Sequence, residues 1–310
     1  MSWNELDTWI VVSASLVAVA CALPGVFLLL SRQSMMAHGI AHSVLPGIVI
    51  AHLVSGGLET PVLLAGAVAA GLACAALTRA LQNLANVEPG AALGIAFTSL
   101  FAVGLTLQRL FADHVHIEPS HVLYGNLETS IFEVVLEGSS FPAVARRAAL
   151  GVLVNAAFVA LFFKELRAAT FDPEHGASVG ARPHMTSYLL MASSAFTCVV
   201  AFEAVGSILV VAMMILPPAF ASLFAGTLRG TFVLSLLFAV GTSVLGHVVS
   251  RGSLGAASAA ALGFEDAGST NTAGGIAVTA GAVLALGVAV RAVLRSRSLT
   301  DESEPRADPA

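Results

Sequence analysis

Long apolar runs, separated by short polar stretches, follow one another along almost the whole chain. A helical run of about 20 apolar residues matches the thickness of the hydrocarbon core of a bilayer. The pattern therefore predicts nine spans, at about residues 8–31, 39–56, 60–79, 89–111, 143–164, 185–202, 204–226, 231–249 and 273–294. We expect an all-α integral membrane protein, a polytopic helical bundle of about eight or nine spans. It would form one transmembrane domain over residues 1–294, followed by a polar cytoplasmic tail over 295–310.

Proline and glycine interrupt several of these runs. Pro46 and Gly47 lie in the second run, and Pro217 and Pro218 lie in the seventh. Proline has no amide hydrogen, so these positions are predicted helix kinks. Broken spans of this kind are typical of transporters, in which the freed backbone groups are satisfied by neighbouring helices or water.

Composition supports a membrane protein and excludes a soluble domain. Hydrophobic residues make up 57% of the 310 residues and charged residues only 11%, and the mean hydropathy is +0.88. An ordinary soluble domain carries about 25% charged residues.

The three cysteines lie in apolar runs without paired spacing, which predicts buried thiols and not a disulfide framework or zinc knuckle. The N-terminal residues lack a basic stretch, so we expect no cleaved signal peptide.

Arginine and lysine placement predicts the orientation. With the N-terminus outside, ten of the fourteen basic residues fall on the inner side and four on the outer side. Because basic residues favour the cytoplasmic side, we expect the N-terminus outside and the C-terminus inside a cytoplasmic (inner) membrane.

No Walker A loop surrounds the single lysine, Lys164, and no zinc-protease or serine-protease motif occurs. We therefore expect no enzyme activity in this chain.

The strongest chemical signal is a pair of histidines, His38 and His42, in the second run. Four residues are about one helical turn, so both imidazoles would lie on the same helix face and could bind one small cation. His42 also precedes Pro46 by four residues, which leaves its backbone carbonyl without the usual helical partner. The alternative is that both histidines only pack within the bundle, the role we expect for His52.

Further polar residues lie toward the predicted outer side. Glu203 is placed at the junction of the sixth and seventh runs and His247 at the end of the eighth, each either near a metal pathway or among lipid headgroups. The loop after the fourth run is rich in metal-binding side chains. They would either capture metal or only form a solvated loop: Asp113, His114, His116, Glu118 and His121.

A short helix is predicted on the inner side after the fifth run. Asp172 would be its N-cap, Pro173 its first residue, and Glu174 would complement the helix dipole. Such a helix either docks onto a partner protein or forms an ordinary connection between two spans.

Four segments, in order, resemble the permease subunits of manganese, zinc and iron ABC importers. The second-run segment Ser34 to Gly47 resembles the family sequence Ser-Leu-Met-Gly-Asp-Ala-Ile-Ser-His-Ala-Val-Leu-Pro-Gly. The other three are Tyr124-Gly125-Asn126, Phe171-Asp172-Pro173-Glu174 with Gly180, and Val205 to Ala219. His42 matches the family histidine, whereas His38 stands where the family has aspartate. The connection over 250–272 is also longer than in the family.

The resemblance implies a type II ABC importer fold and a transported divalent metal (zinc, manganese or iron), with the extra histidine favouring zinc. It further implies a homodimer, two separate ATP-binding cassette ATPase subunits that bind the ATP, and an extracytoplasmic metal-binding protein. The inner segment would couple to the ATPase through Phe171, Asp172, Pro173, Glu174 and Gly180.

No permanently bound cofactor and no nucleic acid are expected; lipids surround the chain. Two alternatives remain: a permease for a metal chelate such as a siderophore or cobalamin, and a membrane-embedded metal-dependent enzyme.

Overall fold

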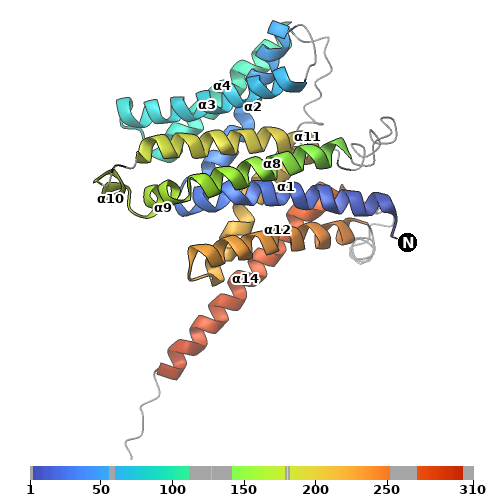
Figure 1. The fold of residues 1–310 in the computed structure, drawn as a ribbon, viewed down its shortest axis with the longest axis vertical. Coiled ribbons are helices and arrows are strands. Elements are labelled where there is room, and N and C mark those ends of the chain that lie inside the picture. Colours follow the sequence, from blue (N-terminus) through green and yellow to red (C-terminus); the bar gives the residue numbers. More distant parts are fainter. Residues whose placement is uncertain are drawn as a thin grey trace, which may run out of the picture.

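The computed structural model describes residues 3–55, 60–111, 127, 142–178, 180, 182–251 and 271–302, and every element in these ranges is a helix (Figure 1). Nine segments of the described chain are long and apolar enough to cross a membrane, which confirms the predicted number. The helices are α1 (Glu5–Leu30), α2 (Met35–Ser55), α3 (Thr60–Ala85), α4 (Pro89–Phe111), α8 (Ala143–Leu161), α9 (Phe163–Phe171), α10 (Pro173–Ser178), α11 (Pro183–Phe224), α12 (Leu228–Ser250) and α14 (Thr272–Glu302).

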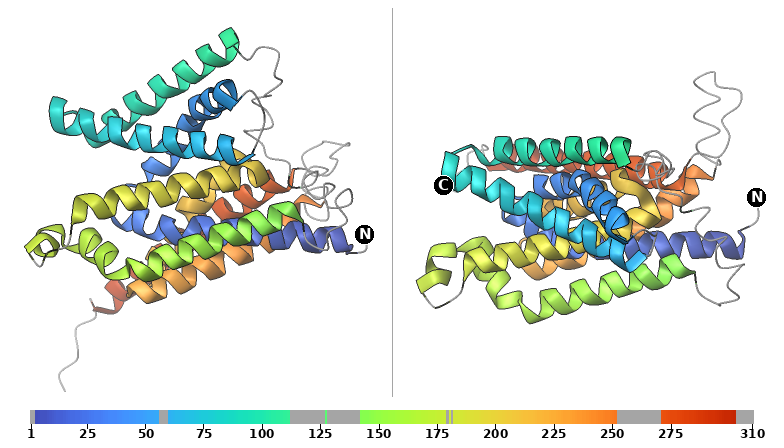
Figure 2. Two further views of the ribbon diagram at one scale, coloured as in Figure 1. Left: turned by 45° about the horizontal axis from the view of Figure 1, so that its top comes forward. Right: turned by 90° about the horizontal axis from the view of Figure 1, so that it is seen from above.

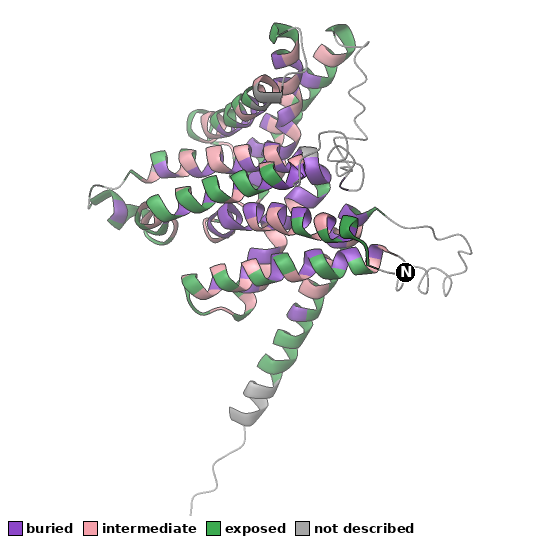
Figure 3. Cartoon of the chain, turned by 45° about the vertical axis from the view of Figure 1, so that its right-hand side comes forward, coloured by how far each residue is buried: buried purple, intermediate pink, exposed green. Residues whose placement is uncertain are grey.

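The bundle is built around α1 and α11. Helix α1 packs on α8, α11 and α12, and 72% of its most apolar stretch is buried, against 17% for α14. Helices α2, α3 and α4 form a second group that attaches mainly to α11 (Figures 1 and 2). Figure 3 shows the buried residues concentrated along the centre of the bundle, whereas the later part of α14 is largely exposed as far as Ser296.

Helix α11 is a hairpin of two limbs. Gly206 is its one non-helical residue, with φ 75° and ψ 165°, a conformation essentially restricted to glycine. Cys198 Sγ lies 3.8 Å from Met214 Sδ, although a straight helix of 16 residues would separate them by about 24 Å. The chain therefore folds back at Gly206. The sixth and seventh predicted spans are joined by a tight turn, and Pro217 and Pro218 lie inside the second limb without breaking it.

Glycine contacts bring α3 and α4 close to α2. A Cβ added at Gly47 or at Gly66 would collide with the backbone carbonyl of the other glycine, so α2 and α3 cross at their backbones. A Cβ at Gly104 of α4 would lie 2.8 Å from the ring nitrogen of Pro46. Small residues permit such close helix crossings in membranes. Glycines therefore pack α3 and α4 around the proline of α2.

The two ends of the bundle differ in what they carry. At one end lie the start of α1 and the end of α12, and we call this the α1 end. Helices α9 and α10 lie at the opposite end, which we call the α9–α10 end (Figure 1). Cys21, Cys74 and Cys198 are all free and buried, as their apolar surroundings predict. Helix α14 continues to Glu302, into the segment 295–310 that the sequence assigns to the polar tail.

Candidate functional site

His38 and His42 lie side by side on α2. Their ring centroids are 4.6 Å apart and the ring planes are inclined by 74°, as the four-residue spacing predicts. Both side chains are half-buried. Two imidazoles at this separation offer ring nitrogens to a single ion after modest rotation of the side chains.

Two phenylalanines of α4 flank the histidine pair. The ring of Phe97 lies 5.7 Å from that of His38 and 6.0 Å from that of His42, and the ring of Phe101 lies 6.0 Å from that of His42. The face of an aromatic ring carries negative potential and attracts cations. The sequence analysis missed these residues, although Phe97 and Phe101 share the four-residue spacing of the histidines.

Pro46 gives this part of α2 a free backbone oxygen. Because proline donates no hydrogen bond, the carbonyl of His42 lacks its usual partner one turn ahead. Gly104 allows α4 to approach the proline ring closely. The histidine pair, the freed carbonyl and the two phenyl rings thus occupy the contact between α2 and α4.

The pair alone does not complete a metal site. Within the described ranges, no group of three or more His, Cys, Asp or Glu side chains is placed to hold a metal ion. Glu203 lies in α11 just before Gly206, and its side chain falls outside the described part, as do Asp113, His114, His116, Glu118 and His121. Two imidazole ligands bind an ion loosely, and water or other residues would supply the remaining ligands.

The predicted short helix is present at the α9–α10 end. Helix α10 begins at Pro173, and the Oδ1 atom of Asp172 accepts a hydrogen bond of 3.0 Å from the backbone N–H of His175. This confirms Asp172 as the N-cap. Phe171 and Glu174 are exposed, and Gly180 has φ 87°, in the region that favours glycine. The side chains of this short helix are therefore accessible at the α9–α10 end.

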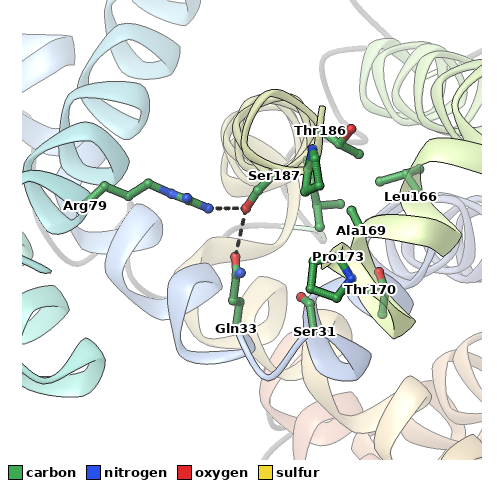
Figure 4. Close-up of a pocket in the computed structure, with 11 residues that line it drawn as sticks. Ser31, Gln33, Arg79, Leu166, Ala169, Thr170, Pro173, Thr186 and Ser187 are labelled. Atoms are coloured by element: carbon green, nitrogen blue, oxygen red, sulfur yellow. Dashed lines mark hydrogen bonds between the residues drawn. The ribbon is translucent and has the colours of Figure 1, made fainter. Parts of the chain in front are cut away.

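A cavity of about 320 Å³ lies beside this helix, between α3, α9, α11 and the turn after α1 (Figure 4). Arg79 of α3 donates a hydrogen bond to the hydroxyl of Ser187 in α11. That hydroxyl lies 3.5 Å from Oε1 of Gln33 in the turn between α1 and α2. The three side chains join the two groups of helices.

A second polar cluster lies at the α1 end. The buried His247 has its Nε2 atom 3.3 Å from Oδ1 of Asp7, and Nη1 of Arg251 lies 2.5 Å from Oδ2 of the same carboxylate. The ring of Trp3 packs edge-on against His247 at 5.9 Å. From the sequence, His247 could lie either near a metal pathway or among the lipid headgroups. In the structure this histidine contacts Asp7, a contact across 240 residues that no local pattern indicates.

These features place the chain in a family of membrane transporters. The sequence profile of the ABC 3 transport family matches residues 4–262, and the chain belongs to this family. The manganese transport system membrane protein MntD of Bacillus subtilis is 36% identical over 250 residues, covering 78% of this chain and 83% of MntD. The zinc transport system membrane protein TroD of Treponema pallidum is 39% identical over 209 residues, covering 67% of this chain and 57% of TroD.

A solved structure has the same fold. PsaBC from Streptococcus pneumoniae, in complex with Fab, superposes with a TM-score of 0.69 and 25% identity, covering 92% of this chain and 91% of that chain. The fold expected from the family resemblance is thus confirmed. The relatives are transport proteins, which agrees with the expectation that this chain is a transporter subunit and not an enzyme.

Proposed function

We propose that this chain is the membrane permease subunit of an ATP-driven importer for divalent transition metal ions. The single observation that carries the proposal is the histidine pair on the proline-containing α2, in a chain whose family profile and relatives are those of metal transporters. Imidazole and backbone oxygen suit zinc, manganese and ferrous iron. His38, in place of the family aspartate, favours zinc, and Glu203 would lie along the same path.

The proposed system contains more than this chain. Two such permease chains would form a homodimer, driven by two ATP-binding cassette ATPase subunits that bind the ATP. An extracytoplasmic binding protein would deliver metal on the outer side, where the sequence predicts a capture loop that contains Asp113, His114, His116, Glu118 and His121. We place the N-terminus outside, and residues 295–310 inside as a polar tail, in the inner membrane of a bacterial cell.

Transport would proceed by alternating access. ATP binding by the partner would move the α9–α10 end through Phe171, Asp172, Pro173, Glu174 and Gly180. The two groups of helices would then shift against each other, with the hairpin α11 between them and the predicted kinks Pro46, Gly47, Pro217 and Pro218 within the moving spans. His42 would bind the ion only transiently, because a site that holds its cargo tightly cannot release it.

Metal uptake by a His42→Ala variant tests the proposal. We expect accumulation of zinc or manganese to fall at least tenfold in cells, while membrane insertion and assembly with the ATPase remain normal. His52→Ala is the matched control, a histidine on the same helix outside the pair, and should transport normally. Unchanged uptake by His42→Ala would remove the histidine from the pathway.

A second candidate function is import of a metal chelate. It is favoured by the chelated iron transport system membrane protein YfeD of Yersinia pestis, 32% identical over 240 residues. A chelate occupies the ligand positions of its own metal, so its transport would not depend on an imidazole. Uptake of free metal that is lost with His42, and uptake of chelate that is not, would distinguish the two functions.

A further inference from the structure

We propose that the cavity around Arg79 binds the phosphate group of an anionic phospholipid. This site is separate from the histidine pair, and the proposal does not depend on which ion the protein transports. The cavity lies at the α9–α10 end, between α3, α9 and α11 (Figure 4). Its volume of about 320 Å³ is at the lower end of the range for ligand pockets, about 300–1,000 Å³.

The positive charge of Arg79 favours an anion as the occupant of the cavity. Arg79 is the one charged residue that lines it, and no carboxylate lies on its wall. In the described part of the chain, Arg79 has no ion-pair partner. Arg79 is half-buried, so part of its guanidinium is withdrawn from water, and a bound anion would offset the charge there.

The hydrogen-bonding capacity of Arg79 is only partly used. Its guanidinium carbon lies 5.0 Å from the ring centroid of Tyr188, a contact with the flat face that leaves the N–H edge free. One terminal nitrogen donates to Ser187, whereas the Nε atom is buried and has no hydrogen-bond partner among the described residues. Buried donors are rarely left unpaired, so Arg79 has hydrogen-bonding capacity that the described residues do not use. Guanidinium groups bind phosphate through two parallel N–H donors.

Hydroxyl and amide groups complete the wall. Ser187 accepts from Arg79 and donates to Oε1 of Gln33 over 3.5 Å, a long hydrogen bond that a phosphate oxygen could replace. On the opposite side of the cavity Thr170 contributes a hydroxyl, whereas the hydroxyl of Ser31 donates to the carbonyl of Leu28 at 3.3 Å (Figure 4). These donors can bind the oxygens of a phosphate group. They do not select a particular lipid headgroup.

The position of the cavity favours a lipid as the source of the phosphate. The cavity lies at the ends of the spans, where headgroups lie, and basic pockets between membrane helices on the cytoplasmic side bind anionic headgroups. Leu190 and Leu166 add an apolar floor for the glycerol region. In the orientation proposed above, this is the cytoplasmic leaflet, which is the anionic one.

Lipid binding to the purified permease–ATPase complex tests the inference. The complex is exchanged into neutral phosphatidylcholine nanodiscs, phosphatidylglycerol is titrated in, and retained lipid is counted by native mass spectrometry. We expect one tightly retained phosphatidylglycerol per permease chain and a loss of affinity of about tenfold or more in Arg79→Gln. Arg229→Gln is the matched control. It removes an exposed arginine from the same end of the bundle, outside the cavity, and should bind as the unaltered chain does.

Further measurements test the role of Arg79 and the source of the phosphate. Arg79→Lys keeps the positive charge but loses the two parallel N–H donors of the guanidinium. We therefore expect an affinity between those of the unaltered chain and Arg79→Gln. Ser187→Ala should weaken retention even if Arg79→Gln fails to assemble. Equal retention of phosphatidylcholine would overturn the preference for an anionic lipid, and displacement of the lipid by millimolar inorganic phosphate would overturn the lipid assignment. Loss of ATPase binding in Arg79→Gln with lipid retention unchanged would also overturn it, in favour of a carboxylate from the partner.

Discussion

At the residue scale, the histidine pair differs from the family pattern in charge. An aspartate at position 38 would bring a negative charge beside His42, whereas the imidazole of His38 offers a ring nitrogen in place of carboxylate oxygens. Nitrogen ligands favour zinc over manganese, which prefers oxygen. The identity of this one side chain should therefore influence which ion passes.

The substitution His38→Asp tests this expectation. We expect transport to continue and the preference to shift several-fold from zinc toward manganese, because a hard oxygen ligand replaces imidazole. The measurement is competition between the two metals for uptake in cells. His38→Ala, which removes the ligand without replacing it, serves as the comparison. If His38→Asp leaves the preference of the unaltered chain in place, His38 lies outside the pathway.

Gly206 is the residue on which the α11 hairpin depends. Any side chain at φ 75° and ψ 165° is strained, and we expect Gly206→Ala to cost about 1–3 kcal/mol of stability. Thermal unfolding of the detergent-purified chain measures this. The control is Gly226→Ala, because Gly226 has open space around its Cα and no positive φ. Equal melting temperatures for the two variants would mean that the turn tolerates a side chain.

At the element scale, α10 is short and depends on its cap. A helix of six residues gains little from its own hydrogen bonds, so the Asp172 cap and the proline at its first position largely define where it begins. Its exposure at the α9–α10 end makes it the part of the chain best placed to follow a partner's motion.

Asp172→Ala should therefore weaken coupling. The cap is worth about 1 kcal/mol, and without it α10 would fray. We expect the ATPase activity of the assembled transporter to respond several-fold less to metal-loaded binding protein, an effect that Glu174→Ala should increase. Asp172→Asn keeps the cap and is the matched control. Coupling that survives in Asp172→Ala together with Glu174→Ala would show that α10 is only a connection.

The sequence predicts single elements well because a membrane demands continuous apolar helices. The nine spans and the α10 cap follow from local patterns such as the run around Pro46 or the order Asp172, Pro173, Glu174. The placement of Phe97 beside His42 does not follow, since it depends on how α4 packs against α2. The reversal between the sixth and seventh spans is predicted, at residue 203, but its placement at Gly206 is not, because a glycine within an apolar run reads as part of a helix.

At the scale of the whole molecule, an ionic cluster joins two helices at the α1 end. Asp7 contacts both His247 and Arg251, and thus joins the first helix to the end of α12. The opposite end is fastened differently, by the Arg79, Ser187 and Gln33 bridge between the two helix groups.

Removing the carboxylate should loosen the α1 end. Asp7→Ala leaves Arg251 and His247 without their shared partner, and breaking a buried pair in this way costs about 3 kcal/mol or more. We expect a lower melting temperature of the purified chain. Glu5→Ala, at an exposed position in the same helical turn, should unfold as the unaltered chain does. A melting temperature unchanged by Asp7→Ala would mean that the cluster stabilises nothing.

The three buried cysteines have a practical consequence. Cys21, Cys74 and Cys198 are the chain's full set of thiols, and all are free and buried. The natural chain therefore has hardly any thiol that a labelling reagent can reach. A single cysteine introduced at an exposed site such as Gly226 would react with a membrane-impermeant reagent from one side of the bilayer only. Labelling of intact cells would thus report the sidedness of each loop without first removing the native cysteines.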